Sequence, residues 1–363
     1  TEKRHEFLTS GSLKIKRKIK FYLKRIRLLS AFRVFVILAA VYFFYQYLKL
    51  NQDGLLYISL ILFAVFIILV RIYFKFKDKL SLERALLGEY QIEINYLAGQ
   101  LPDLSFEAEI PLENHPFAQD LNLFGRRSLF HHLNRSFSKA GRIFIQNDLA
   151  KQEALTEIEG RQESLKELES QSEFNLKFRS LGRGIKEGSS QVHAFIDVWR
   201  EEPLKKISIF VRILMILGQA FVLYALISFA LMPGVETFKL LNYAFIINLL
   251  ITFSQFKNLR KQQFLVAKLS DSMERYAQLI GYLEGRKFKS KALKEQLSHL
   301  GPSLNASKAL DQLSGILNSL DQMANVFVLI FLNGLFHYHL HRLNSLAKWK
   351  EKHAENLSKW IAV

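Results

Sequence analysis

The residues of this chain whose types and spacing suggest chemistry include three histidines in the segment HYHLH, residues 337–341. On a helix, His337 and His341 lie one turn apart on one face, a spacing that can hold Zn²⁺, whereas His339 points away from them. A zinc site needs further ligands, and the sequence places no carboxylate at the next turn. We therefore interpret the histidines as a polar surface patch and predict no metal site.

Catalytic and nucleotide-binding motifs are missing from the sequence as well. Glu107, Glu109 and Glu113 flank a proline-containing loop, but no nucleophile or base lies near them to form an acid–base pair. The glycine-rich segment LGRGIKEGSS, residues 181–190, lacks the Gly-Lys-Ser/Thr end of a phosphate loop, and no Gly-x-Ser-x-Gly turn occurs. We predict no catalytic or nucleotide-binding residue in this chain.

Positive charge is the dominant bulk feature of the sequence. The 363 residues include 50 Lys and Arg against 33 Asp and Glu, a formal net charge of +17, and no cysteine. Disulfides and cysteine-ligated metals are thereby excluded. An excess of positive charge suits nucleic acid or an anionic membrane surface, so its location in the chain must decide between them.

The first basic stretch precedes an apolar segment. Residues 1–30 carry ten Lys or Arg against two Glu, and we predict that the following residues contact lipid headgroups: Lys16, Arg17, Lys18, Lys20, Lys24, Arg25 and Arg27. Next to a spanning helix, each such residue gains about 1 kcal/mol from an anionic lipid surface. Binding of this stretch to DNA is the less favoured alternative.

A second basic stretch, GRKFKSKALKEQ, covers residues 285–296. Its candidates for contact with the phosphates of double-stranded DNA are Arg286, Lys287, Lys289 and Lys291. Such contacts would weaken steeply with added salt. A solvated basic turn is the alternative, and it is the favoured one.

Four apolar segments are long enough, or nearly so, to cross a bilayer as helices. They are AFRVFVILAAVYFFYQYL (31–48), LLYISLILFAVFIILVRIYF (55–74), ISIFVRILMILGQAFVLYALISFALM (207–232) and LLNYAFIINLLITFSQF (240–256). Basic residues flank the outer ends of each pair, and the connecting turns are nearly uncharged. The positive-inside rule then predicts two transmembrane hairpins with every outer end in the cytoplasm. Burial of these segments in a protein core is the alternative.

The segment HPFAQDLNLFGRRSLFHHLNRSFSKAGRIFIQNDL, residues 115–149, resembles the start of the core, or lever, domain of MutS-like proteins. The matching positions include Asp120, Leu123, Phe124, Gly125, Ser128, Leu129, Phe130, Asn134, Gly141 and Arg142. Residues 320–363 are similar to the long return helix that leads into the ATPase domain of that family. Paired apolar hairpins around a lever core are similar to a membrane-bound branch of the family.

The resemblance implies that the family's activity depends on domains that this sequence does not contain. In the family an ATPase domain, which binds ATP and Mg²⁺, follows the return helix, and this sequence stops where that domain would begin. ATPase activity is therefore expected only if such a domain follows residue 363. The family's mismatch reader carries a Phe-x-Glu wedge that does not occur here, so a mismatch-repair role is poorly supported. The resemblance also implies a homodimer in the full-length protein.

Helical periodicity extends over most of the remaining chain, and no sustained strand pattern occurs, so the predicted fold is all-α. Residues 81–100 and 151–178 are predicted to form amphipathic helices, and residues 306–361 two helices or a single long one. Ser128 is expected to cap one short helix, and Ser136 or Ser138 the next. Residues 180–190 form a predicted break, in which Gly182, Gly184 and Gly188 suggest a hinge.

The predicted organisation is that of an integral membrane protein with a cytoplasmic helical core. Its parts are a basic juxtamembrane segment (1–30), a first transmembrane hairpin (31–76), a helical core (77–204), a second hairpin (205–256) and a further core region with the return helix (257–363). We predict the membrane and lever portion of a MutS-like, DNA-associated ATPase in the bacterial inner membrane, with its soluble parts in the cytoplasm. A non-enzymatic membrane scaffold that binds partners is the alternative.

Overall fold

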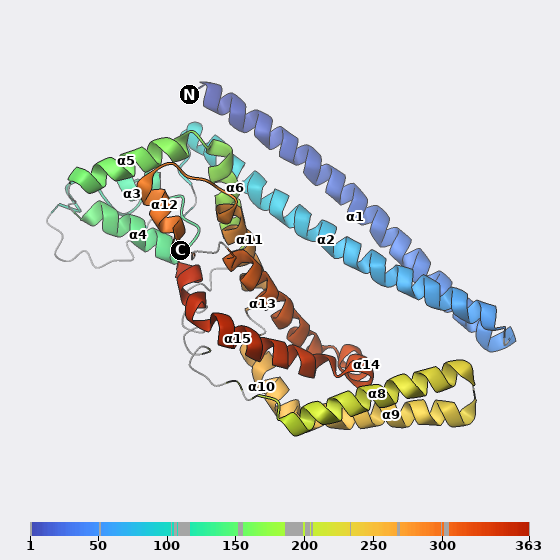
Figure 1. Ribbon diagram of the computed structural model, residues 1–363. Coiled ribbons are helices and arrows are strands. Elements are labelled where there is room, and N and C mark those ends of the chain that lie inside the picture. The colour runs from blue at the N-terminus through green and yellow to red at the C-terminus, as the bar shows by residue number, and fades with distance from the viewer. Residues whose placement is uncertain are drawn as a thin grey trace. The chain divides into compact units, whose positions relative to one another are not determined.

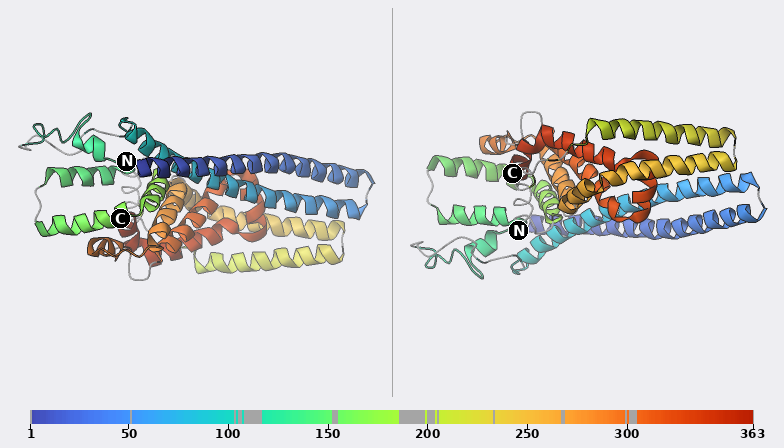
Figure 2. Two further views of the ribbon diagram at one scale, coloured as in Figure 1. Left: turned by 90° about the horizontal axis from the view of Figure 1, so that it is seen from above. Right: turned by 90° about the horizontal axis from the view of Figure 1, so that it is seen from below.

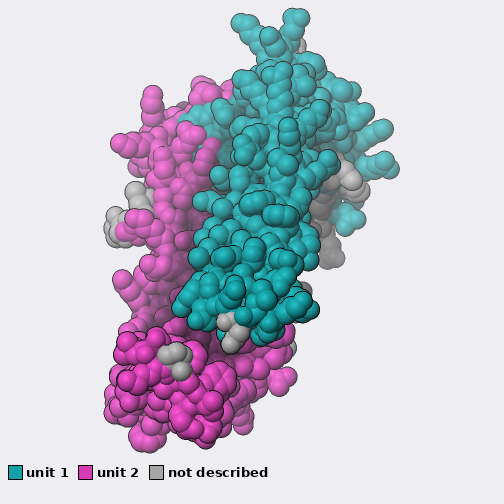
Figure 3. Space-filling model, turned by 90° about the vertical axis from the view of Figure 1, so that its right-hand side faces the viewer, with its two compact units in different colours: residues 1–152, 171–184 teal, residues 153–170, 185–363 magenta. Residues whose placement is uncertain are grey.

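The computed structural model describes residues 2–50, 52–102, 104, 107, 117–151, 155–185, 199, 204, 206–232, 234–266, 269–298, 300 and 305–362. Every regular element in these ranges is a helix (Figure 1), as predicted. The chain divides into two compact units (Figure 3). Unit 1 comprises residues 1–152 and 171–184, and unit 2 comprises residues 153–170 and 185–363. The core predicted for residues 77–204 is thus shared between the two units.

Two long helices dominate unit 1. α1 runs from Glu2 to Leu50 and α2 from Asp53 to Leu97, and they pack antiparallel along their length (Figures 1 and 2). In their polar halves, Leu8 and Ile15 of α1 meet Tyr90 of α2 in a buried apolar cluster. Each apolar segment therefore continues without a break into a charged, amphipathic one, which the sequence had not indicated.

Shorter helices complete unit 1. α3 (Leu129–Leu133) and α4 (Lys139–Ala150) begin at Ser128 and Ser138, whose hydroxyls accept hydrogen bonds from backbone N–H groups as predicted. α6 (Ser172–Arg183) packs on α2. The predicted helix over 151–178 is wrong, because turn residues at Ser170 separate α6 from α5 (Leu155–Glu169), which belongs to unit 2.

The proposed glycine hinge does not hold at Gly182. This residue is buried within α6, where a Cβ atom would overlap the ring of Phe137. Gly182 therefore permits close packing within unit 1 rather than bending. Gly184 caps the end of α6, and Gly188 lies outside the described residues.

Unit 2 contains a second antiparallel pair of apolar helices, α8 (Ile209–Leu231) and α9 (Val235–Ser254) (Figure 2). The chain continues through α10 (Phe256–Val266), α11 (Ser270–Glu284), α12 (Lys291–Ser298), α13 (Ala306–Asp321), α14 (Val326–Phe336) and α15 (Tyr338–Ala362). α13 packs against both α11 and α15 and buries Leu310, Leu313 and Leu317. The indole N–H of Trp349 on α15 donates to the Ala309 carbonyl, 2.8 Å away.

The return helix predicted for residues 320–363 is interrupted twice. A 3-10 turn (Gln322–Ala324) follows α13, and the axis of α14 is bent by 112° from that of the preceding segment. His337, with φ of 46°, then separates α14 from α15 in the left-handed conformation. Because of these breaks, the rigid rod at the C-terminal end is α15 alone rather than one helix from residue 320 onward.

The apolar helices expose many large hydrophobic side chains, whose contact with water would be unfavourable. Among the described residues, α1, α2, α8 and α9 are long and apolar enough to cross a membrane, and α13 with α14 forms a further bent candidate. Leu38 of α1 and Leu250 of α9 are 63% and 64% exposed. Contiguous apolar surface of this size marks contact with lipid or protein. The protein is therefore membrane-associated.

Candidate functional site

The described part of the segment that resembles MutS-like proteins, residues 117–149, contains a tight turn that leads into α3 of unit 1. Gly125 has φ of 106°, a conformation that favours glycine, and the chain reverses there so that Phe130 N–H donates to the Leu123 carbonyl at 3.0 Å. Ser128 is fully buried and accepts a hydrogen bond from His131 N–H at 3.2 Å. Leu123 and Phe130 are buried beneath this turn. These motif residues therefore build structure.

The rest of the motif positions the start of α4. The buried side-chain oxygen of Asn134 accepts from Ser136 N–H at 2.9 Å, and Ser138 accepts from Gly141 N–H at 3.0 Å. A Cβ atom on Gly141 would overlap the Ser136 hydroxyl, which explains the glycine there. The remaining motif residues are at least partly exposed: Asp120, Phe124, Leu129 and Arg142.

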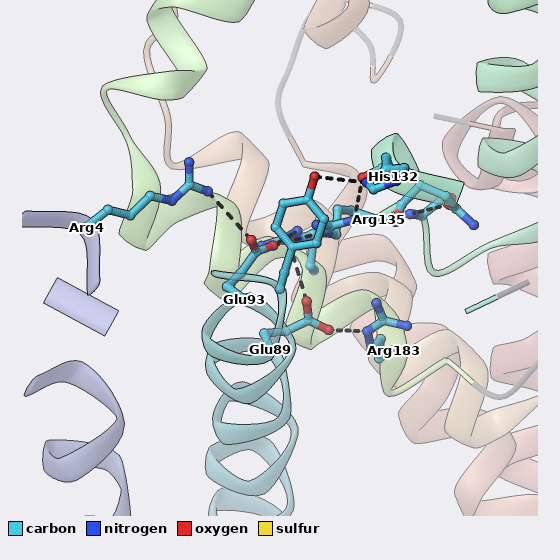
Figure 4. A network of polar contacts seen from close by, with 10 residues as sticks. Arg4, Glu89, Glu93, His132, Arg135 and Arg183 are labelled. Atoms are coloured by element: carbon cyan, nitrogen blue, oxygen red, sulfur yellow. Dashed lines mark hydrogen bonds and ion pairs between the residues drawn. The ribbon is translucent and has the colours of Figure 1, made fainter. Parts of the chain in front are cut away.

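A charged cluster joins this segment to α2 and α6 (Figure 4). Glu89 and Glu93 lie one helical turn apart on α2, and both are buried. Arg179 of α6 pairs with both carboxylates, at 3.4 Å from Glu89 and 2.8 Å from Glu93, and Arg183 pairs with Glu89. Arg135, which follows α3, donates to Glu93 at 3.0 Å. We call these five residues the Glu–Arg clamp.

Arg135 is the link between the clamp and the motif segment. Its guanidinium also donates to the backbone carbonyls of His132 and Asn134, at 3.0 and 2.9 Å. It lies over the ring of Tyr96, 4.5 Å from the centroid, and the Tyr96 hydroxyl lies 3.4 Å from His132 Nδ1. One arginine thus holds the end of α3 against α2 through charge, hydrogen bonds and ring contact.

The electrostatics of the clamp favour ionised carboxylates. Burial would raise the pKa of Glu93, but the guanidinium groups of Arg179 and Arg135 outweigh it and hold that pKa below the usual range. Arg4 of α1 adds a peripheral contact to Glu93 at 3.6 Å. Each buried carboxylate needs its arginines, because an uncompensated buried charge costs several kcal/mol. The clamp is consequently suited to holding elements together.

The two predicted basic surfaces belong to different units, the first to α1 of unit 1 and the second to unit 2. On α1, the predicted lipid-contacting residues are exposed, while the neighbouring Ile15 and Ile19 pack toward α2. Lys18 makes a peripheral pair with Glu83 of α2 at 3.6 Å. Arg33, within the apolar segment, lies over the Tyr73 ring at 4.6 Å from its centroid.

The candidate DNA-contacting residues lie in unit 2, in the turn between α11 and α12 and at the first residue of α12. Lys287, Lys289 and Lys291 are exposed, and Arg286 lies over the Tyr282 ring. Glu167 of α5 holds this turn by accepting from the backbone N–H groups of Lys289 and Ser290, at 2.7 and 2.8 Å. Those hydrogen bonds lower the pKa of Glu167. Contact with DNA phosphates remains a prediction.

The described part of the glycine-rich segment 181–190 does not form a phosphate-binding turn. Gly182 and Gly184 lie at the C-terminal end of α6, where carbonyl oxygens rather than N–H groups point outward and phosphate is repelled. Among the residues that the structure describes, no group of three or more His, Asp or Glu side chains could hold a metal ion. The predicted surface patch is wrong for His337 and His339, which are fully buried around the break between α14 and α15, whereas His341 is exposed.

Sequence reasoning missed the four clamp residues outside the motif. The sequence nevertheless contains a sign of the clamp, since Glu89 and Glu93 are spaced by four residues, as are Arg179 and Arg183. Like charges at helical spacing between apolar residues indicate a charged stripe that needs a partner. Their separation in the sequence hid the pairing.

Known proteins add no family to these observations. Comparison with protein families, with curated proteins and with solved structures finds no match to this chain.

Proposed function

We propose that this chain is the membrane-anchored lever portion of a MutS-like, DNA-associated ATPase. The observation that carries the proposal is the unbroken course of α1 and α2 from exposed apolar segments into a charged helical module. From Phe74 to Leu97, α2 continues for about 35 Å beyond its apolar segment at 1.5 Å per residue. A paired helix of that length transmits movement along its axis.

The clamp supplies the attachment that a lever needs. It fixes the end of α3 and the whole of α6 to α2 within unit 1. Movement imposed on the segment 115–149 would therefore shift α2 and its apolar end. The resemblance to MutS-like proteins supports the origin of that movement in an ATPase domain of a longer protein. ATP, Mg²⁺ and homodimer formation belong to that domain in this proposal.

In the proposed topology, the α1–α2 and α8–α9 pairs both cross the bacterial inner membrane as hairpins. A cytoplasmic location of the outer ends is supported by the positive-inside rule, since basic residues lie there, such as Arg27, Lys75, Lys206 and Lys257. The helical modules of both units then lie on the cytoplasmic side. Lipid is one partner, and double-stranded DNA at the basic turn between α11 and α12 is the other.

The absence of native cysteine makes the topology directly testable, because single cysteines give no background. Asp53→Cys and Glu236→Cys lie in the first turns of α2 and α9, and Lys79→Cys and Lys257→Cys lie past the apolar segments. In sealed membrane vesicles of known orientation, an impermeant maleimide should label the first two only from the periplasmic side. The other two should react only from the cytoplasmic side. Labelling of all four from one side would refute the spanning hairpins.

The lever itself is tested in the longer protein. The reading frame beyond Val363 should encode a Gly-x-x-x-x-Gly-Lys-Ser/Thr loop, and its absence would favour a non-enzymatic scaffold. A spin label at Leu60→Cys, an exposed position in α2, should change mobility when a non-hydrolysable nucleotide binds. Arg179→Ala should abolish the change, and Lys18→Ala, which breaks a peripheral pair, should not. No change in the parent protein would overturn the lever proposal.

DNA association is tested separately. Binding of the detergent-solubilised chain to single- and double-stranded probes is measured across a salt series. Binding to double-stranded DNA should weaken steeply with salt, survive deletion of residues 1–28, and fall when Lys287, Lys289 and Lys291 are changed to Gln. Loss of binding on deletion of residues 1–28 would assign it to the juxtamembrane stretch. Absence of binding at low salt would refute autonomous DNA recognition.

A further inference from the structure

The short helix α14 carries an apolar surface that its own unit leaves uncovered. Its sequence, VFVLIFLNGLF, contains no charged residue. Val326, Phe327, Phe331 and Phe336 are between 53% and 76% exposed. Exposed phenylalanine at this density on an eleven-residue helix is typical of contact with lipid or protein. The contacts that the other faces of α14 make decide whether the exposed face meets lipid or protein.

α14 packs against the middle of an apolar helix pair, mainly on α9. The rings of Phe331 and Phe245 of α9 meet edge to face, with centroids 6.2 Å apart. Gly334 lies so close to Phe245 that a Cβ atom there would overlap the ring. Asn248, the next contact on α9, lies six residues before Ser254, about 9 Å inside the end of that helix at 1.5 Å per residue.

The backbone at both ends of α14 finds partners without water. The side chain of Asn325 accepts from the N–H groups of Phe327 and Val328, at 3.0 and 3.3 Å. At the other end, Asn248 Nδ2 donates to the Gly334 carbonyl at 3.1 Å, and Gln219 Nε2 of α8 donates to the Phe336 carbonyl at 2.9 Å. These are carbonyls that a helix end would otherwise present to solvent.

This arrangement also explains why α8 and α9 carry polar residues in otherwise apolar sequences. Asn248 and Thr252 are buried, and Thr252 Oγ1 donates to the Asn248 carbonyl and lies 3.2 Å from His337 Nδ1. Gly218 gives Asn248 room, because a Cβ atom there would overlap the amide oxygen. Broken backbone at membrane depth is tolerated where protein groups satisfy it. The polar residues of α8 and α9 provide those groups.

We propose that α14 is a re-entrant membrane helix, embedded in the bilayer beside α8 and α9, with its phenylalanine face against the acyl chains. The inference rests on the proposed crossing of the membrane by α8 and α9. If these helices span the bilayer, a helix hydrogen-bonded to Asn248 lies at the same depth. Lipid is the occupant of the exposed face, since that face continues the apolar surface of the two spans.

The test measures depth with nitroxide labels on single cysteines in the full chain, reconstituted in phosphatidylcholine–phosphatidylglycerol vesicles. Phe327→Cys and Phe331→Cys report on α14. Leu223→Cys, exposed on α8, is the lipid reference, and Lys294→Cys, exposed on α12, is the aqueous reference. Collision with oxygen, which concentrates in lipid, is compared with collision with a water-soluble nickel chelate. Circular dichroism of each labelled protein verifies its helix content.

The α14 labels should match the Leu223 label, with high oxygen and low nickel accessibility. Nickel accessibility at Phe327 and Phe331 like that of Lys294, with Leu223 still in lipid, would overturn the inference and leave the spans intact. Low accessibility to both reagents, with spin–spin broadening between copies, would overturn it in favour of protein contact. An aqueous Leu223 label would instead refute the proposed crossing itself.

Discussion

Unit 1 and unit 2 each hold distant segments together through buried polar groups, but they use different chemistry. The Glu–Arg clamp of unit 1 joins full charges, side chain to side chain. The polar cluster of unit 2, formed by Gln219, Asn248, Thr252, Asn333 and His337, uses amides, a hydroxyl and an imidazole, and several of its bonds end on backbone oxygen or nitrogen. Charge is thus used in one place and avoided in the other.

The difference follows the distance of each cluster from the apolar segments. Glu89 and Glu93 lie 15 and 19 residues beyond Phe74, the last residue of the apolar segment of α2. Gln219 and Asn248 lie inside α8 and α9 themselves. A charge in hydrocarbon is expensive, whereas a neutral amide that satisfies a carbonyl is tolerated. The type of buried polar group therefore indicates the surroundings for which each helix junction is built.

The largest effect is expected from removing one carboxylate of the clamp. Glu89→Ala removes the clamp carboxylate of Arg183 and one of the two carboxylates that Arg179 contacts, and it should destabilise unit 1 by about 3–5 kcal/mol. Thermal melting followed by circular dichroism in detergent measures the loss. Trp199, Trp349 and Trp360 all belong to unit 2, so the fluorescence transition should stay in place.

The matched control for that change is Glu236→Ala. Glu236 pairs with Lys239 at 2.8 Å, but both side chains are exposed, so the loss should stay below about 1 kcal/mol. Equal effects of Glu89→Ala and Glu236→Ala would show that burial of the clamp carries no energy.

A smaller effect is expected from the neutral cluster. Asn248→Leu keeps the shape of the side chain but leaves the Gly334 carbonyl unpaired, which should cost about 1–3 kcal/mol. Tryptophan fluorescence during unfolding with added dodecyl sulfate measures it. Asn242→Leu is the control, because that exposed amide bonds only to its own helix, at the Phe238 carbonyl. Equal losses of stability in both variants would show that the hydrogen bond from Asn248 to the Gly334 carbonyl does not stabilise unit 2.

Two glycine substitutions test the packing around Asn248, with an expected change in stability similar to or smaller than that of Asn248→Leu. Gly218→Ala would push a methyl group into the Asn248 amide oxygen and should destabilise unit 2 by about 1–3 kcal/mol. Gly315→Ala on α13 meets nothing within 4 Å and should stabilise the helix by about 0.5–1 kcal/mol. The same fluorescence assay decides, and opposite signs are the expected result.

Acid should lower the stability of unit 1 through the clamp, with a smaller effect than the substitutions above. Because the folded pKa of Glu93 lies below its ordinary value, the clamp contributes its stability above that ordinary value and loses it as pH falls through the folded pKa. The melting transition of unit 1 should therefore move to lower temperature in this acid range. In Glu93→Gln the shift should shrink, and a shift of unchanged size would assign the acid sensitivity to other groups.

The features that the sequence predicted are those set by neighbouring residues. Apolar runs and their length predicted the four long apolar helices, and Ser128 and Ser138 were readable as caps because a cap bonds within its own turn. The clamp was not readable, since Arg183 and Glu89 are 94 residues apart. Ion pairs across that distance depend on how helices pack, and no local pattern specifies it.

The helix breaks in the C-terminal region also depend on contacts between residues far apart in the sequence, which a local pattern does not reveal. Asn325 stands before the apolar run of α14 as a recognisable cap, yet an apolar run can also continue a long helix. What favours the break is the pairing of the α14 carbonyls with Gln219 and Asn248, more than 80 residues away. The predicted helix over 151–178 failed for a related reason, as its two halves pack in different units.

The unbroken course of α1 also sets how far its basic residues stand from lipid. If α1 enters the bilayer near Ala31, as proposed, a rise of about 1.5 Å per residue puts Arg27 about 6 Å and Lys16 about 22 Å from the boundary along the helix axis. Electrostatic attraction is screened over about 8 Å at physiological ionic strength. A flexible tail could fold every lysine onto the membrane, but a helix cannot. In the proposed topology, only the basic residues nearest the apolar segment then lie within range of the surface potential. Those farther out, such as Lys18 beside Glu83 and Arg4 beside Glu93, instead meet carboxylates of the protein itself.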